Sequence, residues 1–154
     1  MMAQKHDPKN GCLRLFHSSE IVRKIPLGGG KVLSKLLRAL NRLFFSCIIV
    51  HGASIPKSVR FYHGGLGVVI GSGVVMGERC IVFQNVTLGN KSEVGEPAYP
   101  TIGNDVTLCA GCCVVGDVHI GDGVIVGANA VVTKDIPEGK TVVGVNRVLG
   151  EDRG

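Results

Sequence analysis

The chain has 154 residues, a length that fits one domain with its own core, and 45% hydrophobic residues, which excludes a disordered polypeptide. Its 23 Gly and its lack of Trp indicate that glycine is used at regular positions. The formal net charge is +5, and residues 1–60 carry 11 Lys and Arg against 2 Asp and Glu. No aromatic platform, helix-turn-helix spacing or zinc-finger pattern accompanies this basic half, so we do not expect nucleic-acid binding.

The sequence gives no sign of a targeting or membrane-spanning segment. The first ten residues lack the apolar centre of a signal peptide, and the longest apolar run, LFFSCIIV at 43–50, is too short to span a bilayer. The six Cys, at positions 12, 47, 80, 109, 112 and 113, follow no regular disulfide spacing. We therefore expect a soluble, cytoplasmic protein with reduced thiols.

Residues 28–47, GGGKVLSKLLRALNRLFFSC, predict an amphipathic helix within an N-terminal segment that covers 1–47. The apolar residues at helical spacing are Val32, Leu36, Leu40, Leu43 and Phe44. The basic residues elsewhere on the wheel are Lys31, Lys35, Arg38 and Arg42. We expect this helix to cap the open end of the strand region that follows, or to pack on a neighbouring subunit. Contact with a membrane surface is the less favoured alternative.

From residue 49 onward, aliphatic residues recur every six positions. They form three runs: Ile49, Ile55, Phe61; Ile70, Met76, Val82, Leu88; and Ile102, Leu108, Val114, Ile120, Val126, Val132. A small residue, often Gly, commonly follows, and a second small or β-branched residue comes four positions on: Val74, Cys80, Val86, Val106, Cys112, Val118, Val124 and Ala130.

A six-residue period does not fit an α-helix, and it leaves no room for the hairpins of an antiparallel barrel. It predicts an all-β solenoid, a parallel β-helix in which each hexad supplies one short strand and a turn. Thirteen hexads at three per coil give about four coils. The predicted organisation is the helical stub at 1–47, the β-helix at 48–150 and a tail at 151–154.

Two insertions interrupt this period. The spacing from Phe61 to Ile70 is nine, which adds three residues within YHGGLG, and that from Leu88 to Ile102 is fourteen, which adds eight within 90–100. Insertions in a solenoid form loops, and loops on a rigid scaffold carry function. After correction for the insertions, the break at His63 and the 90–100 loop lie on adjacent coils, so we expect them to bound one cleft.

Four stretches together resemble a known family: FYHGGLGVVIG, CIVFQNVTLGNK, PTIGNDVTLCAG and VIVGANAVVTKDIP. They resemble the hexapeptide-repeat acyltransferases of the left-handed β-helix class, in the serine acetyltransferase branch with its polysaccharide O-acetyltransferase relatives. The resemblance covers residues 48–150. It implies a left-handed coil, acetyl-CoA as donor, a homotrimer with active sites between subunits, and His63 as general base.

The chemistry of acetyl transfer agrees with these residues. A hydroxyl that attacks a thioester must lose a proton near neutral pH, and histidine is the side chain suited to accept it. A backbone N–H at the Gly89–Asn90 step could stabilise the oxyanion. By register with the family, the acetyl-CoA site is expected to include Gly89, Asn90, Ala110 and Ala128, with Lys134 as a phosphate contact.

Departures from the serine acetyltransferase pattern concern the acceptor. Ile48 stands where the family has the aspartate that orients the histidine, Tyr62 replaces a second aspartate, and Ala98 and Tyr99 replace an Arg-His pair. Because these changes remove charges that would hold an amino acid, we expect a sugar or other glycan-precursor hydroxyl, contacted by Tyr62 and Tyr99. L-serine is the alternative, with Glu93 or Glu96 binding its ammonium group.

Three other hypotheses were weighed. A catalytic part for His51 is less favoured, because it falls in the first hexads and is expected to face solvent or another chain. A metalloenzyme of the β-helix carbonic anhydrase type needs three converging histidines, and the CAGCC run at 109–113 has no second Cys pair, so no metal is expected. A non-catalytic β-helix scaffold would bind no acetyl-CoA.

Overall fold

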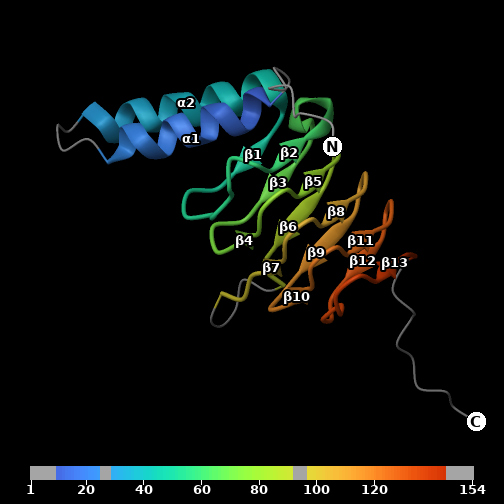
Figure 1. Cartoon of the computed structure of the whole chain (residues 1–154). Coiled ribbons are helices and arrows are strands. Elements are labelled where there is room, and N and C mark those ends of the chain that lie inside the picture. Colours follow the sequence, from blue (N-terminus) through green and yellow to red (C-terminus); the bar gives the residue numbers. More distant parts are fainter. Residues whose placement is uncertain (1–9, 25–28, 92–96, 145–154) are drawn as a thin grey trace, which may run out of the picture.

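The computed structural model describes residues 10–24, 29–91 and 97–144. Two helices come first, α1 (Gly11–Arg23) and α2 (Gly29–Phe45). They are followed, within the described residues, by thirteen short strands and one 3-10 helix, η1 (Tyr62–Gly65). Figure 1 shows the helical pair lying across one end of a stack of strands. The predicted boundaries at 145–150 and 151–154 lie outside the described residues.

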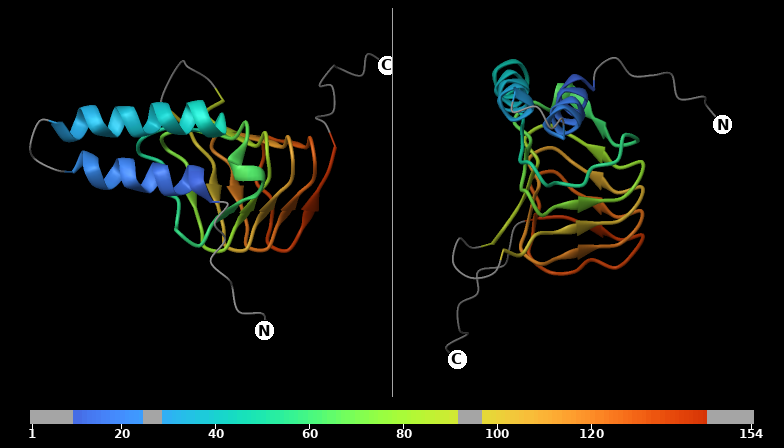
Figure 2. Two further views of the ribbon diagram at one scale, coloured as in Figure 1. Left: turned by 90° about the horizontal axis from the view of Figure 1, so that it is seen from above. Right: turned by 90° about the vertical axis from the view of Figure 1, so that its left-hand side faces the viewer.

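The strands form three parallel sheets that the chain visits in turn. Sheet A contains β1 (Ile48–Ile49), β3 (Val69–Ile70), β6 (Thr87–Gly89), β9 (Cys113–Val115) and β12 (Val131–Val132). Sheet B contains β4 (Val75–Met76), β7 (Thr101–Ile102) and β10 (His119–Ile120). Sheet C contains β2 (Arg60–Phe61), β5 (Ile81–Val82), β8 (Thr107–Leu108), β11 (Ile125–Val126) and β13 (Thr141–Val142). This order makes a three-sided parallel β-helix (Figure 2).

The register follows the six-residue period and its two insertions. Val69 pairs with Thr87 and Cys113 pairs with Val131, each eighteen residues apart. Val75 instead pairs with Thr101, eight residues beyond that offset, because the second insertion intervenes. A bridge from Ile120 to Ile136 and the pairing of β13 with β11 continue the stack past the last predicted hexad.

The interior of the prism is the predicted one. The thirteen aliphatic repeat residues are all buried, with Ile55 the most accessible at 5%, and the eight smaller inward residues are at most 3% exposed. Burying one such Val, Leu or Ile side chain stabilises the fold by about 1.5–3 kcal/mol. The repeat therefore accounts for both the shape and the stability of this part of the chain.

Helix α1, which the sequence did not predict, covers the first coil. Its buried residues Cys12, Leu13 and Phe16 are at most 2% exposed and belong to the same core cluster as the prism interior. Just before the helix, Asn10 donates from Nδ2 to the carbonyl of Val59 at 2.9 Å and accepts the N–H of Phe61 at 3.0 Å. These contacts close the end of the β-helix, which would otherwise be an open sheet edge.

Helix α2 forms where predicted, but its orientation is not the expected one. Its buried residues are Gly30, Ser34 and Asn41, whose small or polar side chains accompany close packing against α1. The predicted apolar side is turned to solvent: Val32, Leu36, Leu43 and Phe44 are 54–75% exposed. Helix α2 thus lies over the end of the β-helix with α1, which supplies the apolar cap, and packing of α2 on a neighbouring subunit stays a prediction.

Over the described residues, no helix combines the length and the apolar character needed to cross a bilayer. The six cysteines are free thiols, as the sequence predicted. Burial, together with the neighbouring Cys109 and Cys113, raises the pKa of Cys112 to about 12, so this thiol stays protonated near neutral pH.

Candidate active site

His63 lies on a strained turn between sheets C and A. It belongs to η1, which leads from β2 to β3, and its backbone is left-handed, with φ 53° and ψ 32°. A non-glycine residue in this region is uncommon and is held there by its surroundings. Here Gly64 and Gly65 continue the positive φ, and the carbonyl of His63 accepts the N–H of Leu66 at 3.3 Å. The turn leaves the His63 side chain exposed.

Aromatic side chains form a wall beside this histidine. The rings of Tyr62 and Phe83 stack with their centroids 4.9 Å apart, and the His63 ring lies 6.4 Å from that of Phe83. The guanidinium carbon of Arg60 lies 6.0 Å from the Tyr62 centroid. Phe83 was missed by sequence reasoning, although one signal was there: it follows Val82, at the hexad position where most repeats have a small residue.

Among the described residues, no carboxylate orients the imidazole. Ile48, at the position of the expected aspartate, is a half-buried residue of β1. Within 10–24, 29–91 and 97–144, the His63 ring forms no hydrogen bond. Its nitrogens are therefore open to a substrate or to a group from another chain.

Two predicted donor-site residues lie along the same corner as His63. Ala110 and Ala128 each follow a strand of sheet C, β8 and β11, as η1 follows β2. Backbone hydrogen bonds join the successive corners, from the N–H of Asn85 to the carbonyl of Leu66 at 2.8 Å and from the N–H of Asn129 to the carbonyl of Ala110 at 2.9 Å. We call this corner, defined by His63, Phe83, Ala110 and Ala128, the His63 edge.

The other predicted residues lie on a different corner, between sheets A and B. Gly89, Asn90 and Tyr99 surround the insertion between β6 and β7, and Lys134 follows β12. Asn90 accepts the N–H of Ala98 through Oδ1 at 3.2 Å. We call this corner, defined by Gly89, Asn90, Tyr99 and Lys134, the loop edge. Glu93 and Glu96 lie outside the described residues.

The structure separates the two edges within one chain. His63 precedes β3, and the insertion follows β6, which is the parallel neighbour of β3 in sheet A. The start of one parallel strand and the end of the next lie at opposite sides of a sheet. One chain alone therefore does not bring the two interruptions into a single cleft. The sequence-based expectation of one cleft within a chain is wrong for this reason.

The two tyrosines predicted as acceptor contacts are likewise apart. Tyr62 is 39% exposed on the His63 edge. Tyr99 packs on Gly71 and Gly73, where its ring fills the space that a Cβ atom would need, and its hydroxyl accepts from Ser72 Oγ at 3.2 Å. This packing takes up part of the Tyr99 ring, which is half-buried, so its contact with the acceptor stays a prediction.

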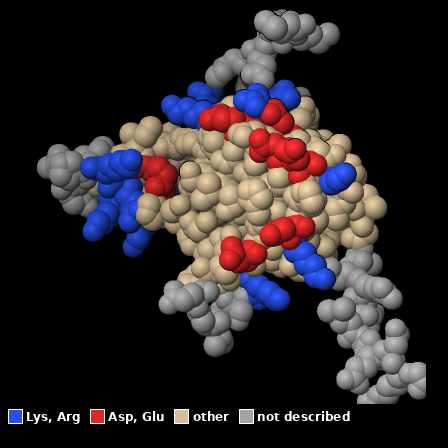
Figure 3. Space-filling view, turned by 60° about the horizontal axis from the view of Figure 1, so that its bottom comes forward, with Lys and Arg blue, Asp and Glu red and all other residues tan. Residues whose placement is uncertain are grey.

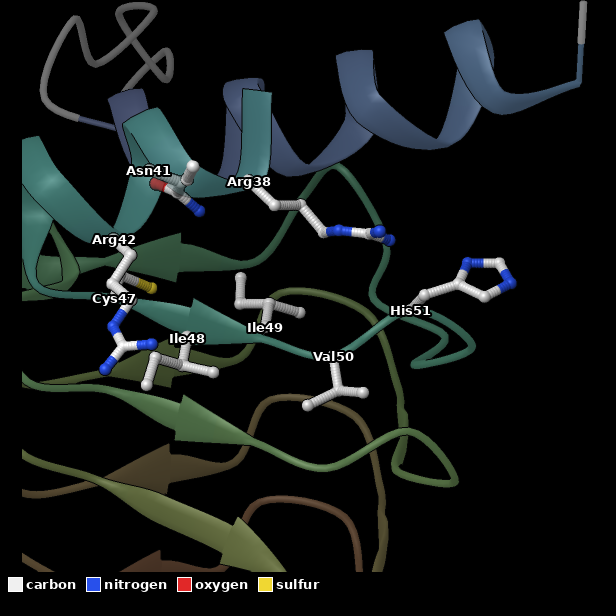
Figure 4. Close-up of a pocket in the computed structure, with 9 residues that line it drawn as sticks. Arg38, Asn41, Arg42, Cys47, Ile48, Ile49, Val50 and His51 are labelled. Atoms are coloured by element: carbon white, nitrogen blue, oxygen red, sulfur yellow. The ribbon is translucent and has the colours of Figure 1, made fainter. Parts of the chain in front are cut away.

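A cavity of about 450 Å³ lies elsewhere, between α2 and β1. Figure 4 shows its floor formed by Ile48, Ile49 and Val50 of the first coil, with Arg38 and Arg42 reaching down from α2. At its end, His51 Nδ1 is 2.7 Å from a carboxylate oxygen of Glu20, so His51 links the first coil to α1. This contact gives His51 a structural part.

In the described part of the chain, no group of three or more His, Cys, Asp or Glu is arranged so that it could hold a metal ion.

Comparison with known proteins places these features in a family. The family described as bacterial transferase hexapeptide (six repeats) matches residues 99–134. A serine acetyltransferase of Helicobacter pylori is 39% identical over 122 residues, covering 77% of this chain and 71% of that protein. The Neisseria gonorrhoeae serine acetyltransferase solved in complex with serine has a TM-score of 0.72 at 30% identity, covering 89% of this chain and 55% of that one. A serine acetyltransferase solved in complex with CoA has a TM-score of 0.70 at 27% identity, covering 84% and 53%.

The chain belongs to the hexapeptide-repeat transferases, whose left-handed β-helix it shares. Within them it is a member of the serine acetyltransferase family. It spans about half the length of other curated relatives, 46% in one case. Family membership and handedness are thus confirmed, whereas the activity of this chain has to be argued from its own site.

Proposed function

We propose that this chain is an acetyl-CoA-dependent O-acetyltransferase acting in the cytoplasm, with His63 as general base. The observation that carries the proposal is the His63 edge. An exposed histidine on a strained turn starts this edge, and Ala110 and Ala128 continue it over the next coils with side chains too small to block a long ligand. Relatives solved with serine and with CoA support the same reaction class.

In the proposed reaction, His63 accepts the proton of the acceptor hydroxyl as that oxygen attacks the thioester carbonyl. Backbone N–H groups at Gly89–Asn90 stabilise the negative charge that develops on the carbonyl oxygen. The carbon–sulfur bond then breaks, and the CoA thiolate takes the proton from the imidazolium of His63. No covalent intermediate with the protein is needed, and the acetyl group ends on the acceptor.

Because Gly89 and His63 lie at opposite sides of sheet A, this reaction needs two chains. We place the His63 edge of one chain against the loop edge of the next, with Lys134 of that edge near the CoA phosphates. Such a contact joins two different surfaces, and a rotation of one third of a turn closes it into a homotrimer. The trimer is therefore part of the proposed site.

As acceptor we now favour L-serine over a sugar. The comparisons do not support the sugar preference, and packing on Gly71 and Gly73 takes up part of the Tyr99 ring, one of the two on which it depended. Arg60, beside Tyr62 on the first turn of the His63 edge, is a cation able to pair with a carboxylate. Tyr62 and Phe83 then form the apolar wall next to the small acceptor.

The test is an assay of thiol release from acetyl-CoA in the presence of L-serine or of nucleotide-linked sugars. We expect release to depend on the acceptor and the specificity constant to be highest for L-serine. A higher constant for a sugar would refute the acceptor, and acetyl-CoA binding without release in any arm would refute the catalytic proposal. If the chain does not bind acetyl-CoA at all, the result would support the alternative of a non-catalytic β-helix scaffold.

A further inference from the structure

Helix α2 presents a continuous apolar side that nothing in the described chain covers. This surface, the apolar face of α2, consists of Val32, Leu33, Leu36, Leu40, Leu43 and Phe44. Five of these six side chains are 45–75% exposed, and Leu40 is half-buried. Exposed apolar side chains are ordinary when scattered, but a stripe along a whole helix indicates a binding surface.

The position of the helix leaves this face accessible. In Figure 2 the two helices lie side by side over the first coil and extend beyond the prism, so part of α2 projects from the body. The side of α2 that packs against α1 carries Gly30, Ser34 and Asn41, and the apolar face lies on another side of the helix. A flat partner can therefore reach it without displacing α1.

The charges around this face are almost all of one sign. On α2, Lys31 and Lys35 are exposed, Arg38 and Arg42 line the pocket against β1, and there is no Asp or Glu; α1 with its cap adds Arg14, Arg23 and Lys24. The one carboxylate of the two helices, Glu20, is already bound to His51 and lies 4.0 Å from Arg38. Figure 3 shows Lys and Arg gathered at the end where the helices protrude.

We propose that α2 docks the protein on an anionic lipid surface, with its apolar face at the acyl boundary and the exposed Lys31 and Lys35 near the headgroups. An apolar stripe on a basic helix is the arrangement that such interfaces bind. The charges argue against a second copy as the occupant. Each helical layer carries an excess of positive charge, and α2 has no carboxylate with which a second copy could pair.

This contact would hold the enzyme at the surface reversibly and leave the prism in water. The helix would lie in the interface rather than cross it, which agrees with the lack of a spanning helix among the described residues. The inference does not depend on the proposed reaction, because it uses neither edge of sheet A.

The experiment is co-sedimentation of the full chain with vesicles of phosphatidylglycerol and phosphatidylcholine, compared with phosphatidylcholine alone. We expect binding to the anionic vesicles, weakened by high salt because the charges are screened. The double variant Val32→Glu/Leu36→Glu should reduce affinity about 10-fold or more. Val143→Glu is the matched control, since Val143 on the prism is 74% exposed and Val32 is 70% exposed. The control should bind as the unaltered chain does.

A second variant separates charge from apolar contact. Lys31→Gln/Lys35→Gln should weaken binding to anionic vesicles and make the remaining binding less sensitive to salt. Circular dichroism should be unchanged in all these variants, and thiol release with a dissolved acceptor should be unchanged in the two variants of α2. The proposal is overturned if the unaltered chain does not sediment with anionic vesicles, or if Val32→Glu/Leu36→Glu binds them normally. It is equally overturned if that variant loses its oligomeric state in analytical ultracentrifugation, because a second copy would then cover the face.

Discussion

The two edges of sheet A are built in different ways. Along the His63 edge, the first corner is lengthened by three residues that form η1, the later corners keep the repeat, and backbone hydrogen bonds of 2.8–3.0 Å tie Leu66, Gln84 and Ala110 to the next corner. Along the loop edge, the insertion after β6 interrupts the corners, and Tyr99 holds the returning chain by packing on Gly71 and Gly73. The repeated edge is suited to fix a base and a long groove, whereas the interrupted edge is suited to vary with the acceptor.

This comparison also supports the proposal that the site is shared between two chains. Each edge carries only part of the proposed chemistry: the base and the small residues on one, the backbone donors and Lys134 on the other. Parallel strands keep the described parts of the two edges on opposite sides of the prism. A change on either edge should therefore lower activity while leaving the other edge intact.

The largest effect is expected at the start of the His63 edge. His63→Ala should lower kcat about 100-fold or more, because a general base acts in the transition state, and should leave acetyl-CoA affinity nearly unchanged. The measurements are steady-state thiol release and equilibrium binding of acetyl-CoA. His119→Ala is the matched control, since His119 is also exposed but lies in β10 of sheet B, away from the His63 edge. Near-normal turnover of His63→Ala would exclude this base.

A somewhat smaller loss is expected on the loop edge. Gly89→Leu should reduce kcat/KM about 30-fold, because the added side chain would occupy the space facing the reacting carbonyl. The fold should tolerate the change, since a Cβ atom at Gly89 meets nothing within 4 Å and its φ is not positive. Thermal unfolding measured beside the kinetics checks this point. Full activity in a folded variant would remove Gly89 from the site.

The smallest effect is expected within the groove. Ala110→Leu should raise the KM for acetyl-CoA about 10-fold and change that for the acceptor much less, because the larger side chain obstructs the path of the donor. Ala128→Leu, one coil further on the same edge, should have the same direction of effect. If the acceptor KM rises instead, the donor does not run along the His63 edge.

The fold was predictable where one local rule repeats. All thirteen aliphatic hexad residues are in the core, and the register shifts by the lengths of the two insertions. The helical layer obeys no such rule. In α1, the buried apolar residues are Cys12, Leu13 and Phe16, and polar residues lie among the other apolar ones. The helical periodicity of its apolar residues is therefore weak. The apolar pattern of α2 predicted the helix correctly but not which side is buried, because that depends on α1.

The site was predictable only in part, for a related reason. The break in the repeat located His63, and the resemblance located the small residues, but the assignment of loops to corners requires counting strands around the prism. Phe83 was missed because a single large residue at a corner carries no period. Tyr99 was assigned to the acceptor because its glycine partners, Gly71 and Gly73, come from another part of the chain.

The most direct test of the central claim, a site shared between two chains, is complementation between inactive variants. His63→Ala and Gly89→Leu chains, refolded together in equal amounts, should recover about a quarter of the unaltered activity. In randomly mixed trimers, half of the His63 edges are intact and half of those face an intact loop edge. Neither variant alone should exceed its own residual rate. Recovery to about this level, with a trimer in sedimentation, is what the account predicts; a mixture no more active than the mean of the two variants would contradict it.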